Sequence, residues 1–160
     1  MQSEPQKEHQ WLSNLVGAWT FESECKMGPD QPPMVSQGAE FVRSLGGLWT
    51  VAEANAEVPG ASGWQSIMTL GFDPRTGRFI GTFIATMMSH MWVYNGTLDV
   101  YRKTLTLDTE GPSFTAENKM VKYQDIIEIK SGDHRILRAQ SMGEDGKWQH
   151  FMTAHYWRVK

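Results

Sequence analysis

Most of the chain alternates between apolar and polar residues in short runs that are typical of β-strands. From Gly17 onward these runs are rich in Val, Ile, Thr, Phe, Tyr and Trp, and Gly, Pro, Asn and Asp separate them at intervals of roughly ten residues. The long segment 27–36, which contains three prolines, is predicted to be a loop. The runs predict about ten strands, over residues 17–26, 38–45, 48–57, 64–73, 78–88, 91–99, 104–109, 117–129, 133–142 and 148–159.

The first sixteen residues predict the one helix of the chain. Ser3 is a favourable helix cap, and Glu4 and Pro5 suit a first turn. Trp11 and Leu15 are four residues apart, so they share one apolar face. We therefore expect residues 1–16 to cap a core that residues 17–160 build.

The connections between the predicted strands have the length of turns. A parallel pair of strands needs a long crossover, so neighbouring strands must run antiparallel. A long antiparallel sheet tends to curl, and closure removes its exposed edges. The fold class is therefore all-β: one domain over residues 1–160, in which a single antiparallel meander of about ten strands closes into a barrel.

The turn at Leu45-Gly46-Gly47-Leu48 has the sequence of a two-residue hairpin, which would set the register of the strands beside it. In that register Glu40 faces Glu53, and two like charges tolerate this position only in water. The expected outer face is then Glu40, Val42, Trp49, Val51 and Glu53. The expected inner face is Ala39, Phe41, Arg43, Leu45, Leu48, Thr50, Ala52 and Ala54. Arg43 would lie either at the rim, with its guanidinium in solvent, or inside as a clamp for an anion.

Alternation is clear in the first predicted strand and ambiguous in the last. Trp19, Phe21, Ser23 and Cys25 share one face, which we expect to point inward. In the last strand both faces are about half apolar, one with Trp148, His150, Met152, Ala154, Tyr156 and Arg158, the other with Gln149, Phe151, Thr153, His155 and Trp157.

Composition and charge exclude several classes of protein. The hydrophobic fraction of 40% is ordinary for a globular chain, which argues against disorder. The formal net charge of −3 gives no basic excess for phosphate contacts, so nucleic acid is not an expected partner. The single cysteine and the absence of a basic region followed by an apolar stretch near Met1 favour a cytoplasmic protein without membrane insertion.

No pattern of metal-ligating or catalytic residues stands out. His150 and His155 are separated by an odd number of positions, which sends them to opposite faces of a strand, so no metal site is predicted. Asp108, Glu110 and Asp125 are expected to be solvated, which leaves no carboxylate pair for acid–base catalysis. His90 lies in a methionine-rich stretch, residues 87–94, which suits either a core contact or an adaptable binding surface.

Motifs along nearly the whole chain resemble the bacterial domain-of-unknown-function family 1579, which has a lipocalin-like, calycin-type barrel. They lie in residues 9–12, 16–22, 43–49, 69–82, 90–94, 105–114 and 151–156. The Gly17-x-Trp19 pair is also similar to the first-strand signature of lipocalins, in which a basic residue of the last strand packs across the tryptophan. The resemblance implies that Arg158 packs over Trp19, that His150, Met152, Ala154 and Tyr156 point inward, and that His155 points outward.

The barrel predicts a binding protein, because barrel mouths commonly hold small apolar ligands. We expect a small hydrophobic or anionic amphiphilic ligand and no cofactor, with the following contacts: Trp19, Phe21, Phe41, Arg43, Met68, Phe83, His90 and Tyr156. Three alternatives remain open: an enzyme that uses His90 as acid or base in the cavity, a structural or homo-oligomeric protein with a filled barrel, and a haem protein that uses His155. Fold alone does not decide among them.

Overall fold

The computed structural model describes residues 3–26, 28 and 30–160, and this part of the chain forms ten strands. The prediction of an all-β meander is confirmed. The strands are β1 (Gly17–Cys25), β2 (Met34–Leu45), β3 (Trp49–Glu57), β4 (Trp64–Asp73), β5 (Arg78–Ala85), β6 (Trp92–Leu98), β7 (Thr104–Pro112), β8 (Met120–Ser131), β9 (His134–Met142) and β10 (Trp148–Arg158).

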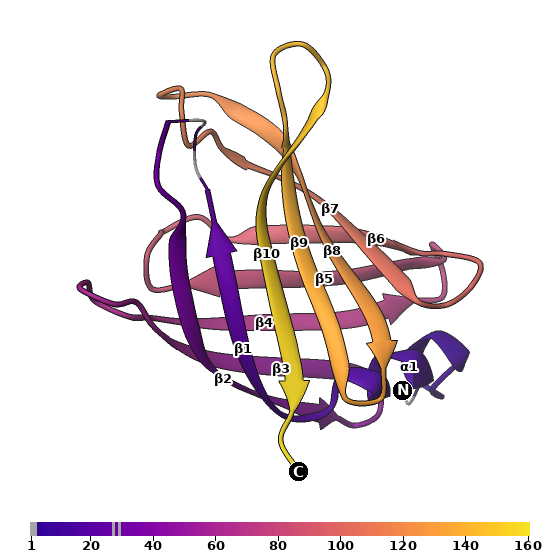
Figure 1. Cartoon of the computed structure of the whole chain (residues 1–160). Coiled ribbons are helices and arrows are strands. Elements are labelled where there is room, and N and C mark those ends of the chain that lie inside the picture. The colour runs from indigo at the N-terminus through magenta and orange to yellow at the C-terminus, as the bar shows by residue number, and fades with distance from the viewer. Residues whose placement is uncertain (1–2, 27, 29) are drawn as a thin grey trace.

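Each strand pairs antiparallel with its neighbours in the chain, and β1 also pairs with β10, so the sheet closes into a barrel. Figure 1 shows the helix α1 (Lys7–Leu12) at the lower end together with both termini, and the β9–β10 hairpin at the opposite end. The largest shift of a single strand boundary is at the start of β2, which begins at Met34 because residues 34–37 also pair with β1. Residues 27 and 29 of the predicted loop lie outside the described residues.

The N-terminal helix is shorter than predicted and begins later. It spans Lys7–Leu12 and continues as a 3₁₀ turn over Ser13–Leu15. Ser3 is therefore not its cap; the ring of His9 accepts a hydrogen bond from the backbone N–H of Gln6 at 2.9 Å and so closes the first turn. The predicted apolar face is buried, since Trp11, Leu12 and Leu15 belong to the core of the barrel.

The two ends of the barrel sheet meet at Trp19 and Arg158. These residues are paired across β1 and β10, and the guanidinium of Arg158 lies 4.3 Å from the centroid of the Trp19 ring. Arg158 also donates hydrogen bonds to three backbone carbonyls: those of Val16 at 2.6 Å, Asn14 at 3.0 Å and Gly132 at 2.8 Å. One side chain of the last strand thus holds the segment before β1 and the β8–β9 turn together.

The β2–β3 hairpin has a three-residue loop, not the predicted two-residue loop. Leu45 pairs with Trp49, and Gly46 and Gly47 both adopt left-handed backbone conformations, with φ of 65° and 75°. This difference of one residue reverses the faces of β2, because side chains alternate along a strand. Val42 and Glu40 therefore point inward and Phe41 and Arg43 outward, whereas Thr50, Ala52 and Ala54 of β3 point inward as expected.

The structure also differs from the prediction that His150 points inward, because β10 contains a bulge. The register between β9 and β10 shifts between His150 and Met152, so Phe151 turns toward the interior and His150 is exposed. Beyond the bulge the alternation follows the predicted parity: Ala154 and Tyr156 are buried, and His155 is exposed.

Candidate functional site

The barrel encloses a cavity of about 400 Å³. Small side chains on one wall make the space, because Ser36, Thr50, Ala52, Ala54 and Ser66 occupy inward positions of β2, β3 and β4. Larger apolar side chains line the remainder, among them Phe21, Leu70, Phe83, Ile127, Leu137 and Met152. The wall is thus mainly apolar, as in most sites for small ligands.

The cavity reaches solvent at one end. Met34, Met87 and Phe114 line it and are nevertheless 56%, 55% and 48% exposed. At the other end Leu15, in the 3₁₀ turn after α1, closes it. Methionine and phenylalanine form an adaptable apolar rim, which suits entry of an apolar molecule.

A buried ion pair lies at the cavity wall, close to the ring of Trp19. Arg135 of β9 pairs with Glu40 of β2, and both side chains are largely buried and line the cavity. The guanidinium of Arg135 lies 3.9 Å from the centroid of the Tyr156 ring and 4.7 Å from that of Trp19. Burial raises the pKa of the Tyr156 hydroxyl, and the nearby Glu40 carboxylate raises it further. Tyr156 is therefore neutral at physiological pH.

A second polar group is formed by Tyr94 of β6 and Asp125 of β8. The Tyr94 hydroxyl donates a hydrogen bond to Oδ2 of Asp125. Burial raises the pKa of Asp125 to about 6, although the hydrogen bond from Tyr94 opposes this change. The carboxyl of Asp125 therefore changes its charge within the physiological range of pH.

Asp125→Asn should stabilise the protein more at pH 7.5 than at pH 4. The folded-state pKa of Asp125 is about 6, above the ordinary value of 3.8, so the stability that its neutral form contributes is present below pH 4 and is lost as the pH rises through 6. This difference in pKa corresponds to roughly 3 kcal/mol at most. Denaturant unfolding of the wild type and the variant at both pH values measures it. Asp108→Asn, which removes an exposed carboxylate of β7, is the control, and a gain that is larger at pH 4 would contradict the burial of Asp125.

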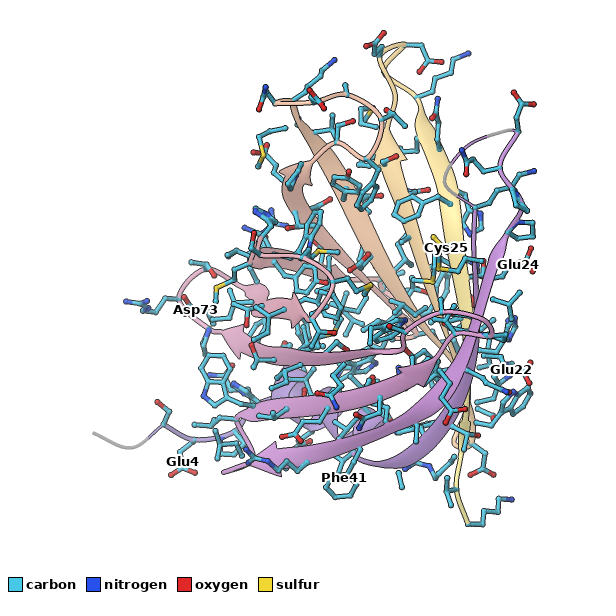
Figure 2. All side chains as sticks on the ribbon, turned by 90° about the vertical axis from the view of Figure 1, so that its left-hand side faces the viewer. Glu4, Glu22, Glu24, Cys25, Phe41 and Asp73 are labelled. Carbon is cyan, nitrogen blue, oxygen red and sulfur yellow. The ribbon has the colours of Figure 1, made fainter. Side chains whose placement is uncertain are left out.

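Four of the residues predicted to contact a ligand line the cavity: Phe21, Met68, Phe83 and Tyr156. Trp19 is buried beside it, under the guanidinium of Arg135. The alternation predicted for β1 is present, and Figure 2 shows Glu22 and Glu24 on one side of the strand and Cys25 on the other. The side chains of β1 lie as expected because Trp19 and Phe21 are two positions apart and therefore share one face, which must point inward if both are to be buried.

Phe41 and Arg43 are not part of the cavity. Phe41 is 57% exposed and projects from the outer surface in Figure 2, and Arg43 is exposed on the same face. Their predicted inward placement was wrong because the hairpin register differs by one residue. The predicted anion clamp at Arg43 therefore does not exist in the cavity, and the arginine that lines it is Arg135.

The histidines proposed for chemistry also lie outside the cavity. His90 is half-buried against the edge of β7, where its Nε2 lies 3.0 Å from the backbone oxygen of Glu110 and its ring packs edge-on against Trp92 at 4.7 Å. His155 is exposed on the outer face of β10, where its Nδ1 lies 3.1 Å from Nε2 of His134. Among the described residues that line the cavity there is no histidine, so neither an acid–base role of His90 in the cavity nor a haem ligand at His155 fits this geometry.

Sequence reasoning missed the three charged residues of the cavity, Glu40, Asp125 and Arg135. A signal for Asp125 was present: Tyr123, Ile127 and Ile129 share its parity, whereas the other face of β8 carries Gln124, Glu128 and Lys130 beside the apolar residue Ile126. Asp125 was therefore wrongly expected in solvent. Arg135 had no such signal, because the adjacent Ile136 and Leu137 make both faces of β9 apolar.

The described residues were also compared with the requirements of a metal site and of a membrane-spanning helix. They contain no group of three or more His, Cys, Asp or Glu side chains arranged to hold a metal ion. They also contain no helix with the length and apolar character needed to cross a membrane.

The chain forms a closed ten-stranded antiparallel barrel with an internal cavity. Residues 4–158 match the model of the family described as "Protein of unknown function (DUF1579)". The chain therefore belongs to the DUF1579 family, as its motifs predicted.

Solved structures of low sequence identity share the fold. Rv2717c from M. tuberculosis is 17% identical and has a TM-score of 0.69, over 98% of this chain and 100% of that chain. The S-type phycobiliprotein lyase CPES from Guillardia theta is 10% identical and has a TM-score of 0.59, over 99% of both chains. No curated protein sequence matches this chain.

Proposed function

We propose that this protein binds a small, largely apolar molecule inside the barrel. The observation that carries the proposal is the cavity itself: about 400 Å³ of space with apolar walls, a few convergent polar groups and an exposed apolar rim. Ligand sites commonly have volumes of about 300–1,000 Å³ and this composition. Protein interiors are otherwise packed closely, so a space of this size is unusual unless something occupies it.

The cavity also favours binding over a purely structural role. A filled barrel would carry large side chains at the inward positions of β3, yet this strand presents Thr50, Ala52, Ala54 and Ala56 there. The phycobiliprotein lyase shares the barrel, but at 10% identity this likeness concerns the fold alone. The proposal therefore depends on the residues of this chain and on no neighbour.

Filling the cavity should weaken binding without unfolding the barrel. Ala54→Leu adds apolar volume to the wall, and we expect it to weaken binding of the neutral dye Nile red by about tenfold or more. Fluorescence titration measures the affinity, and circular dichroism checks the fold. Asn55→Leu, at the adjacent exposed position of β3, is the control and should bind as the wild type does. Equal affinity of the wild type and Ala54→Leu, or no dye binding by the wild type, would overturn the proposal.

A further inference from the structure

The charged groups of the cavity are not equally available to a ligand. Among the described lining residues they are Arg135, Glu40 and Asp125. The guanidinium of Arg135 is paired with Glu40 and lies over the rings of Tyr156 and Trp19, and its buried Nε has no hydrogen-bond partner among the described residues. The positive charge is thus compensated, and an anionic ligand would have to compete with the Glu40 carboxylate for it.

Asp125, in contrast, has room for a second partner. The carboxylate accepts a hydrogen bond from Tyr94 on Oδ2, and no further hydrogen bond to it is present among the described residues. The Asp125 side chain lines the cavity, and the residue is half-buried. An ionised carboxylate can accept several hydrogen bonds, so Asp125 offers unused acceptor capacity inside the barrel.

Thr109 provides a second unpartnered group in the same region. Its hydroxyl oxygen is buried without a hydrogen-bond partner, and the residue lines the cavity. Thr109 pairs with Tyr123 across β7 and β8, and the next inward position of β7, Leu107, pairs with Asp125. Thr109 and Asp125 therefore lie close together on one wall. Buried polar groups are nearly always satisfied, so the unpartnered hydroxyl points to a hydrogen-bonding group supplied from outside the chain. The carboxylate beside it only accepts hydrogen bonds, which favours a donor.

We propose that the ligand is an apolar amine, whose ammonium group donates hydrogen bonds to the Asp125 carboxylate and the Thr109 hydroxyl. This inference rests on the proposed function and names its ligand class. The lining carries two carboxylates and one guanidinium, so with Asp125 ionised the cavity has a net charge of −1, which favours a cation over an anion. The apolar part of the amine would extend past Met68 and Phe83 toward the rim at Met34 and Met87.

Three probes with the same alkyl chain test the headgroup: decylamine, decanol and decanoate, each measured by displacement of Nile red at pH 7.5. We expect decylamine to bind about tenfold more tightly than decanol, because hydrogen bonds between charged groups are roughly twice as strong as neutral ones, and decanoate to bind most weakly. In Asp125→Asn the preference for decylamine over decanol should fall to about twofold or less. Asp108→Asn, on the outer face, should keep the full preference.

The same comparison at pH 5 gives a second readout. Protonation of Asp125 should weaken decylamine binding by about tenfold relative to pH 7.5 and change decanol binding far less, since the pKa of this carboxyl is about 6. The titratable and charged groups around Asp125 are Tyr94, Tyr123, Tyr156, Glu40 and Arg135. Burial raises the pKa of all three tyrosines, so none of them ionises between pH 5 and 7.5.

The outcomes separate this inference from the proposed function. Decanoate as the tightest probe, equal affinities for all three probes, or a preference for decylamine that survives in Asp125→Asn would overturn the amine assignment while the cavity remained a binding site. Failure of Nile red and of all three probes to bind would overturn both proposals.

Discussion

Glu40→Leu should lower the free energy of unfolding by about 3–5 kcal/mol, because it leaves the Arg135 guanidinium buried without its partner. Arg135→Met should be similarly destabilising, since it leaves the Glu40 carboxylate unpaired. The double variant Glu40→Leu/Arg135→Met should recover most of the loss, because a buried ion pair contributes little net stability compared with apolar groups of similar volume. Denaturant unfolding of the four proteins measures the coupling between the two residues.

The exposed pair of Lys119 and Glu144 provides the control. Its nitrogen and oxygen are 3.4 Å apart and its side chains are largely in solvent, so Glu144→Leu should change the stability by about 1 kcal/mol or less. Equal losses from Glu40→Leu and Glu144→Leu, or simple additivity in the double variant at the buried pair, would show that Glu40 and Arg135 do not depend on each other.

Trp19→Ala should also cost about 3–5 kcal/mol, the usual cost of truncating a buried tryptophan. Two guanidinium groups, of Arg135 and Arg158, lie over this ring, and its Nε1 donates a hydrogen bond to the backbone oxygen of Leu15 at 2.9 Å. Arg158→Ala should cost less, because its contact with the ring is worth about 0.5–2 kcal/mol. Its other contacts are hydrogen bonds to backbone carbonyls and an ion pair with the exposed Asp133, all near solvent.

The double variant Trp19→Ala/Arg158→Ala should lose less than the sum of the single losses, because the two side chains share one contact. Trp157→Ala, which truncates a half-exposed tryptophan on the outer face of the same strand as Arg158, is the matched control and should cost far less than Trp19→Ala. Strict additivity of Trp19→Ala and Arg158→Ala would mean that the contact over the ring contributes nothing to closure.

The sequence predicted the strands better than the wall of the cavity. Strand number, order and closure follow from the short connections and from the alternation of residues, and both are properties of neighbouring positions. The faces of β2 depended on whether the loop after Leu45 holds two residues or three, a difference that no residue of β2 reveals. This one error of register predicted Phe41 and Arg43 inside the barrel and Glu40 outside, which is the reverse of their positions in the structure.

The polar groups of the cavity depend on contacts between strands that are distant in the chain. Glu40 and Arg135 lie on β2 and β9, and Tyr94 and Asp125 on β6 and β8. Such pairs form because the closed barrel brings distant strands together, and local spacing in the sequence does not reveal them. The partners of these charged residues therefore could not be predicted. The contact of Arg158 with Trp19 was predicted only because the Gly17-x-Trp19 pair and the place of Arg158 are similar to a lipocalin motif.

The pairing of β1 with β10 sets the order in which this barrel can be assembled. During synthesis β2 is available to pair with β1 long before β10 has been made, so the other edge of β1 stays unpaired. The two arginines that lie over Trp19 also belong to the last two strands, β9 and β10, so their contacts with the ring form late. Contacts of such long sequence separation form slowly, and an unpaired edge is a template for aggregation. The barrel can therefore close only after its last strand has left the ribosome, and a nascent chain that stalls before β9 would expose the apolar cavity wall to its neighbours.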